Sequence, residues 1–247
     1  MNIKDRIRNG NVVYGTWCLL PSPEVINVLA KAGLDFVLID MEHGPMDYAL
    51  AQKMIMAAES EGCEAIIRVA KNDESDVLRA LDIGASGVIV PHIESVSDRE
   101  RAISYMKYPP LGIRGFSPYT RAGGFSSRSG HTVTANKRVL TGIIIEGKEG
   151  LNNLLAILDD VELDIVYIGT YDLSVILGVP GEVKHEKVQE VLASCVKQIR
   201  SSGKAAGCLF HDPCELDYFI NMGIQFLAYK VDSSVLYDGF AFIRGIN

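Results

Sequence analysis

The chain has 247 residues, of which 48% are hydrophobic and 22% are charged, and its formal net charge at pH 7 is −7. This composition is typical of a soluble globular protein with a large core, built either as one barrel-sized domain or as two small ones. The negative charge argues against nucleic acid or an anionic membrane surface as the main partner, and it leaves small ligands open.

The N-terminal segment MNIKDRIRNGN carries charges where a signal peptide needs an apolar core. No window approaches the ~18 uninterrupted apolar residues of a membrane span. We therefore expect a cytoplasmic protein with no membrane partner. The five cysteines form no C-x-x-C pair, so they predict buried free thiols rather than a disulfide framework or a zinc knuckle.

In chain order, short β-rich runs alternate with amphipathic helical patterns such as PEVINVLAKAG and NDESDVLRALDIGA, which end in or near glycine. The runs cover residues 12–18, 35–40, 65–69, 87–91, 142–146, 164–169, 205–210 and 226–231. Eight such β-α units in about 250 residues predict a single (β/α)8 TIM barrel over residues 1–247. An open doubly wound sheet is the alternative, although no G-x-G-x-x-G follows the first run.

Two segments depart from this rhythm. Residues 108–138 are rich in Gly, Pro, Ser and Arg, and we expect a long active-site loop rather than a disordered insertion. The C-terminal stretch SSVLYDGFAFIRGIN carries more apolar residues than one helix face needs to cover its own barrel. It predicts a C-terminal helix used in oligomerisation, with ordinary packing of an eighth helix as the alternative.

Polar side chains gather at or just after the ends of the predicted strands. In a TIM barrel, these C-terminal strand ends form the active site. A core strand ends repeatedly on charged groups only where the ends line a wet pocket, although any one residue could instead cap a helix. The side chains are Asp40, Glu42, His43, Arg68, His92, Glu94, Glu146, Asp172, His211, Asp212, Lys230 and Asp232.

Four of these residues suggest chemistry. Glu146 and Asp172 follow adjacent strands, where two carboxylates can converge on a hard divalent cation, although Asp172 could simply N-cap a helix. Arg68 must face either a carboxylate or an anionic ligand, so a structural salt bridge is its alternative. His43 stands where a tuned base is expected, or it is an ordinary surface imidazole.

Five segments resemble, in the same order, the signature segments of the HpcH/HpaI class II aldolase family, and the resemblance covers nearly the whole chain. They are GTWCLLPSPEVINVLAKAGLDFVLIDMEHGPMD, LDIGASGVIVPHIES, YPPLGIRGFSPYTRAGGF, IEGKEGLNNLLAIL and YIGTYDLSVILGVPG. The resemblance implies a metal-dependent barrel that reversibly cleaves a 4-hydroxy-2-keto acid to pyruvate and an aldehyde through a metal-stabilised enolate. It also implies homohexamers with exchanged C-terminal helices.

The resemblance further implies a role for each matching residue. Glu146 and Asp172 would bind Mg²⁺, Mn²⁺ or Co²⁺, and the backbone of Gly169, Thr170 and Tyr171 would hold the keto-acid carboxylate. Arg68 would bind substrate and stabilise the enolate. His43 would be the acid/base, with Asp40 beside it and Asp82 supporting it from a neighbouring subunit.

The chain departs from the family pattern at three places. Ile144 stands where the family commonly has Gln, Thr170 replaces the usual proline of a turn and is followed by Tyr171, and Lys230 replaces a small residue. Lys230 suggests an anionic aldehyde, or it is an exposed lysine. Two other functions stay open: an acyl-CoA or oxo-acid lyase of the same superfamily, and a catalytically weak barrel that acts as a binding module.

Overall fold

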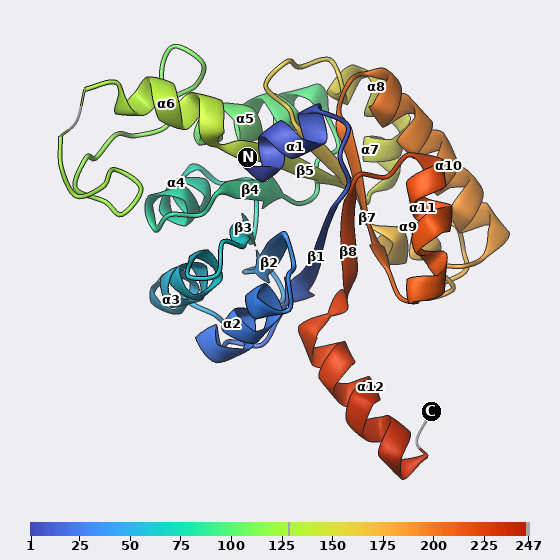
Figure 1. Cartoon of the computed structure of the whole chain (residues 1–247). Helices are drawn as coiled ribbons and strands as arrows, with labels where there is room; N and C mark the ends of the chain where they lie inside the picture. Colours follow the sequence, from blue (N-terminus) through green and yellow to red (C-terminus); the bar gives the residue numbers. More distant parts are fainter. Residues whose placement is uncertain (128, 246–247) are drawn as a thin grey trace.

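The computed structural model describes residues 1–127 and 129–245. Eight parallel strands close into a barrel in chain order, so the predicted TIM-barrel fold is confirmed (Figure 1). Each strand begins and ends within two residues of its predicted bounds, which is the usual uncertainty of element ends. The strands are β1 (Val13–Cys18), β2 (Phe36–Asp40), β3 (Glu64–Arg68), β4 (Gly87–Val90), β5 (Leu140–Ile145), β6 (Ile165–Ile168), β7 (Ala205–Phe210) and β8 (Phe226–Val231).

Helices connect the strands, and several begin at a side-chain cap. Asp47 accepts a hydrogen bond from the backbone N–H of Leu50, and Ser22 caps the helix that precedes β2 in the same way. The helices are α1 (Ile3–Arg8), α2 (Pro23–Lys31), α3 (Tyr48–Glu59), α4 (Glu74–Asp82), α5 (Val96–Met106), α6 (His131–Arg138), α7 (Lys148–Asn152), α8 (Leu154–Ile157), α9 (Thr170–Ile176), α10 (Glu186–Ser201), η1 (Pro213–Glu215), α11 (Leu216–Met222) and α12 (Asp232–Arg244).

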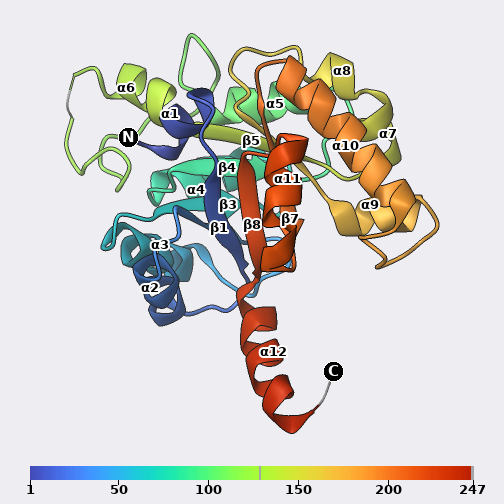
Figure 2. The same ribbon diagram turned by 45° about the vertical axis from the view of Figure 1, so that its right-hand side comes forward.

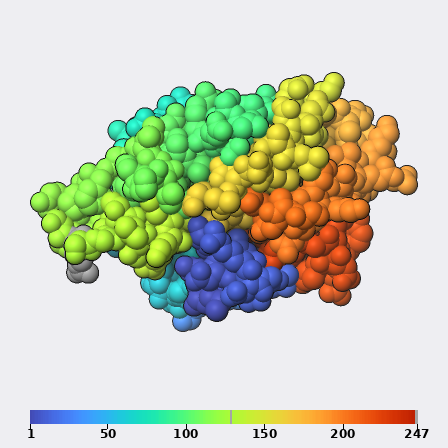
Figure 3. Space-filling model, turned by 90° about the horizontal axis from the view of Figure 1, so that it is seen from above, coloured from blue at the N-terminus to red at the C-terminus, as the bar shows by residue number. Residues whose placement is uncertain are grey.

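The core has two parts. Alternate strand residues such as Leu38, Ile66 and Ile144 fill the inside of the barrel, and the residues between them pack outward against the helices. Ile3 of α1 joins the interior cluster, so α1 lies across the opening where the strands begin. Viewed from that end, the N-terminal residues lie between the green segment before β5 and the orange α10–α11 region (Figure 3).

The loop predicted near the active site lies at the opposite end of its own barrel. The backbone N–H of Ala122 donates to the carbonyl of Asp82 at the end of α4, and Arg114 is paired with the Asp82 side chain. Both ribbon views place this segment beside α1 and α4, where the strands begin (Figures 1 and 2). Therefore it does not line the C-terminal strand ends of its own subunit.

The C-terminal helix α12 projects away from the barrel in both ribbon views (Figures 1 and 2). Its side chains Phe240, Phe242 and Ile243 are 70–78% exposed. Packing of α12 as an ordinary eighth helix is therefore not what the structure shows. Within the described residues, no helix combines the length and apolarity that crossing a bilayer requires.

Candidate active site

A buried ion pair joins the ends of β2 and β3. Asp40 and Arg68 are partners in the strand register, so their side chains leave the sheet at the same level. Arg68 Nε donates to Asp40 Oδ1 at 2.8 Å, and Nη2 donates to Oδ2. Asp40 Oδ1 also accepts from the backbone N–H groups of Glu42 and His43, at 3.0 and 3.2 Å. Asp40 therefore fixes both the guanidinium and the turn that carries His43.

The remaining edge of the Arg68 guanidinium faces the site. Its Nη1 lies 3.2 Å from Glu42 Oε2, and its plane lies over the Trp17 ring at 4.5 Å from the centroid. Trp17 in turn donates from Nε1 to the Tyr167 hydroxyl at 2.8 Å. Burial would lower the pKa of Arg68, but the bonds to Asp40 and the charges of Glu42 and Glu146 raise it. Arg68 is thus a fixed cation rather than a mobile surface arginine.

Glu146 and Asp172 lie together beside Gly169. Glu146 directly follows β5, and Asp172 is in the first turn of α9 rather than at its N-cap, which is Gly169. A β-carbon built on Gly169 would stand 2.8 Å from Glu146 Cβ, 3.3 Å from Glu146 Oε2 and 3.5 Å from Asp172 Oδ2. Only glycine leaves room for the two carboxylates at this position.

The electrostatics of Glu146 fit a divalent cation. Burial raises the pKa of Glu146, hydrogen bonding and charge from His92 lower it, and the carboxylates of Asp172 and Glu42 raise it further. Such crowding of carboxylates is unfavourable unless a cation neutralises it. Among the residues that the structure describes, no three His, Cys, Asp or Glu side chains are placed to hold a metal ion. Mg²⁺ and similar cations need only one or two carboxylates, because waters and substrate oxygens complete their shell.

His92 was among the polar strand ends but had no predicted role, and the structure places it between two acids. Its ring Nε2 lies 2.8 Å from Glu42 Oε1 and its Nδ1 lies 2.9 Å from Glu146 Oε1. Its backbone N–H also donates to Glu146 Oε1, at 2.8 Å. The available signal is a polar residue two positions after the buried strand GVIV, since such a residue lies at the barrel mouth.

His43 and Asp82 lie at opposite ends of the same barrel. His43 is exposed in the turn after β2, whereas Asp82 ends α4, which returns the chain to the strand starts. Arg114 Nη2 donates to Asp82 at 2.8 Å. Within one chain the two residues therefore do not meet, and the predicted support of His43 by Asp82 requires a second subunit.

Part of the backbone that is predicted to hold the keto-acid carboxylate already makes a hydrogen bond within the barrel. The N–H of Gly169 donates to the carbonyl of Ile145 at 3.1 Å as part of the sheet edge. Thr170 and Tyr171 are the first residues of α9, and the N–H groups of a first turn have no intrahelical acceptor. These two donors are the ones that a carboxylate could reach.

The residues at which the chain departs from the family pattern lie in different parts of the structure. Ile144 is buried in the interior cluster of the barrel. Tyr171 and Lys230 line a hollow of about 430 Å³ beside α9, together with Lys184, His211 and Asp238. Lys230 adopts a left-handed backbone with φ of 48°, and its Nζ lies 2.5 Å from Asp238 of α12. It is thus a paired residue at the strand end rather than an isolated exposed lysine.

His211 is the centre of this hollow. Its Nε2 lies 3.3 Å from the Tyr171 hydroxyl. Burial lowers the pKa of His211, Glu215 opposes this effect, and the charges of Lys230 and Lys184 lower it further. The hollow therefore brings together an imidazole, a phenol and two lysines.

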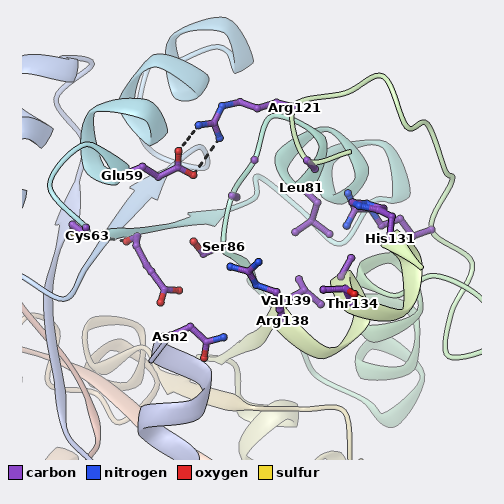
Figure 4. A pocket seen from close by; sticks show the side chains of 17 residues that line it. Asn2, Glu59, Cys63, Leu81, Ser86, Arg121, His131, Thr134, Arg138 and Val139 are labelled. Atoms are coloured by element: carbon purple, nitrogen blue, oxygen red, sulfur yellow. Dashed lines mark hydrogen bonds and ion pairs between the residues drawn. The ribbon is translucent and has the colours of Figure 1, made fainter. Parts of the chain in front are cut away.

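A second hollow of about 510 Å³ lies at the other end of the barrel (Figure 4). The starts of β3 and β4 line it, as do Arg121 and His131 from the loop region. Arg121 is paired with Glu59 across its rim (Figure 4). None of the carboxylates around Glu146 lines this hollow, so it is not the candidate active site.

Comparisons with known proteins show the family to which the chain belongs. The model of the HpcH/HpaI aldolase/citrate lyase family matches residues 13–238. A pyruvate aldolase of Rhizobium etli is 32% identical over 96% of this chain and 94% of its own length. A 4-hydroxy-2-oxo-heptane-1,7-dioate aldolase of Salmonella dublin is 32% identical over 96% of this chain and 90% of its own length. An HpcH/HpaI family structure from Burkholderia cenocepacia J2315 has a TM-score of 0.93 at 28% identity, covering 98% of this chain and 97% of that one.

Proposed function

Since this chain belongs to the HpcH/HpaI aldolase/citrate lyase family, and so is a carbon–carbon lyase of the class II pyruvate aldolase group, we propose that it reversibly cleaves a 4-hydroxy-2-keto acid to pyruvate and an aldehyde. The observation that carries this proposal is the fixed guanidinium of Arg68 at the same barrel edge as Glu146 and Asp172. Cleavage of a keto acid requires one group that binds its oxygens and another that stabilises the negative charge developing on the keto oxygen. Residues at this edge of the barrel could serve both purposes.

The resemblance to this family implies metal dependence, and in this chain Glu146 and Asp172 would hold the cation, as Mg²⁺, Mn²⁺ or Co²⁺. When bound, the cation would supply Lewis acidity to the carbonyl of the keto acid. The N–H groups of Thr170 and Tyr171 would receive the substrate carboxylate, since they are the unpaired donors of the first helical turn.

Arg68 would stabilise the negative charge that appears on the keto oxygen. As the bond between C3 and C4 breaks, its electron pair moves toward the C2 carbonyl, and the 4-hydroxyl loses its proton as the aldehyde forms. Asp40 holds Nε and Nη2 of Arg68, so the guanidinium is in position before the charge develops. A preorganised donor of this kind does not have to reorganise during the reaction.

His43 would accept the proton of the 4-hydroxyl and release it to solvent, and the enolate would take up a proton from solvent at C3 to become pyruvate. Its imidazole is exposed, and its backbone is fixed by the hydrogen bond from its N–H to Asp40. The group that orients the imidazole would be Asp82 of a neighbouring subunit, because Asp82 of the same chain lies at the opposite barrel end.

The active form would be a homo-oligomer, for which the resemblance implies a hexamer. The exposed apolar face of α12 supports this, since contiguous apolar surface of this kind marks interaction sites in soluble proteins. The loop near Asp82 and Arg114 would then contact the C-terminal strand ends of a neighbour, which its own barrel cannot offer.

The aldehyde would carry an anionic group. The hollow beside α9 offers the donors Tyr171, His211 and Lys230. Lys230 is paired with Asp238, which is half exposed, and such pairs contribute only about 0–1 kcal/mol. A substrate carboxylate can therefore replace Asp238 at little cost.

The test is condensation of pyruvate with two aldehydes of equal length, succinic semialdehyde and butanal, by the purified full chain with Mn²⁺. We expect a higher kcat/KM for the carboxylated aldehyde, and about a tenfold loss of that preference in Lys230→Leu, as for a hydrogen bond to a charged group. Turnover of oxaloacetate or malyl-CoA without any aldol product would instead support the acyl-CoA or oxo-acid lyase.

The metal requirement has its own test. EDTA should abolish activity reversibly, and Glu146→Gln should lose Mn²⁺ affinity because a neutral amide is a poor ligand for a hard cation. Full turnover by metal-free protein would contradict the assignment of Glu146 and Asp172.

A further inference from the structure

His92 has a backbone conformation that side chains rarely adopt. Its φ is 55°, and among the described residues only Phe125 and Lys230 share a left-handed φ without being glycine. A residue that is not glycine persists in such a conformation only where its surroundings impose it, and these positions cluster at functional sites. His92 directly follows Pro91 at the end of β4, so the strain lies at the mouth of the barrel.

The two carboxylate oxygens of Glu146 have different surroundings, because His92 contacts only one of them. The backbone N–H and Nδ1 of His92 both reach Oε1, at 2.8 and 2.9 Å. The other oxygen, Oε2, lies on the side of Gly169, where a β-carbon would stand 3.3 Å from it and 3.5 Å from Asp172 Oδ2. One oxygen is thus anchored to the residue after β4, while the other lies, like Asp172 Oδ2, on the side of Gly169.

The imidazole also connects Glu146 to the cluster around Arg68. Its Nε2 lies 2.8 Å from Glu42 Oε1, and Glu42 Oε2 is 3.2 Å from Arg68 Nη1. His92 therefore lies between the carboxylate that would bind the cation and the one that contacts the guanidinium. Glu42 and Glu146 would repel each other without a donor between them.

We propose that His92 is a positioning residue of the cation site, which holds Glu146 so that only Oε2 faces Asp172 and which keeps Glu42 away from that oxygen. The inference rests on the proposed function, because it takes Glu146 and Asp172 as the cation ligands. Partners that orient a metal-binding carboxylate typically change metal affinity by about 10–100-fold when they are removed.

Mn²⁺ affinity, measured by electron paramagnetic resonance on the purified full chain without keto acid, tests this. His92→Gly removes the imidazole and keeps a backbone suited to φ of 55°. We expect it to bind Mn²⁺ about 10–100-fold more weakly. His92→Asn should recover most of the loss, because asparagine tolerates the left-handed conformation and retains a donor.

Phe125→Gly is the matched control, since it relieves a similar φ of 58° in the loop before α6 and should leave Mn²⁺ affinity unchanged. If the glycine variant at position 92 does not fold, His92→Ala serves as the second deletion, with folding checked by thermal unfolding in EDTA. Wild-type affinity in the folded deletion variant would overturn the proposal.

A second readout separates positioning from direct ligation. Electron spin echo spectra of wild-type protein with Mn²⁺ should lack the strong nitrogen coupling of a directly bound imidazole, and finding that coupling would also overturn the proposal. Because both measurements omit substrate, they remain valid if the aldol reaction fails. Conversely, if the Mn²⁺ measurements overturn the role of His92, the cleavage of 4-hydroxy-2-keto acids can still be tested on its own.

Discussion

Asp40→Ala should destabilise the protein far more than the loss of an ordinary surface acid. The substitution leaves the guanidinium of Arg68 without its two-point partner in a site where Asp40 is 1% exposed. Breaking a buried ion pair by removing one partner costs about 3–5 kcal/mol. Arg68 keeps Glu42 at 3.2 Å and exposes 11% of its side chain, so we take the lower end of that range.

A loss of about 3 kcal/mol corresponds to a fall in Tm of about 6–12 °C for a chain of this length. Thermal unfolding by circular dichroism measures it, in EDTA and at equal protein concentration so that neither metal nor assembly contributes. Asp40→Asn should lose about half as much, because its amide oxygen still accepts from the N–H groups of the turn after β2.

Glu61→Ala is the matched control, since it breaks the exposed pair with Lys31 and should change stability by no more than about 1 kcal/mol. If Asp40→Ala were no more destabilising than this control, the Asp40–Arg68 pair would be solvated. The view of Arg68 as a cation fixed by burial would then be wrong.

Three further outcomes follow from the site. Arg68→Ala should lower kcat about 10²–10³-fold with a smaller change in KM, because its main contact would form as charge develops; steady-state kinetics would contradict this if only KM rose. The pKa of His211 lies below its ordinary value of 6.5, so the imidazole is neutral at pH 7. Lowering the pH below the pKa of His211 should add a positive charge and lower KM for a carboxylated aldehyde but not for a neutral one; equal pH dependence of the two KM values would count against the hollow as the aldehyde site. Asp82→Ala and His43→Ala should each be inactive, and verified mixed oligomers should recover part of the activity; no recovery would exclude a site shared between subunits.

The barrel was predictable because its signal is local. Most strands are short runs buried on both faces, and several helix patterns end near a glycine, so eight alternations determine the architecture. The meeting of Asp40 with Arg68, and of Glu146 with Asp172, follows from the same reasoning, because adjacent parallel strands end at one edge. Their roles in catalysis and metal binding stay predictions.

Other features depend on geometry that periodicity does not encode. The left-handed backbone of His92, which directs its ring between Glu42 and Glu146, has no counterpart in the residue pattern. The loop was expected at the active site, yet its hydrogen bonds to the end of α4 hold it at the other end of its own barrel. Sequence spacing gives the separation of residues along the chain. It does not show whether a loop serves the active site of its own barrel or that of a neighbouring copy.

Trp17 gives the protein an internal optical reporter. It is the only tryptophan in the sequence, its ring lies under the guanidinium of Arg68, and its indole N–H is bonded to Tyr167. The entire tryptophan emission of the chain therefore originates beside the candidate active site, from an indole that is only 6% exposed. A ligand whose charge reaches Arg68 changes the electrostatic surroundings of this indole, so we expect occupancy to alter the intensity or wavelength of the emission, which needs no label or coupled assay.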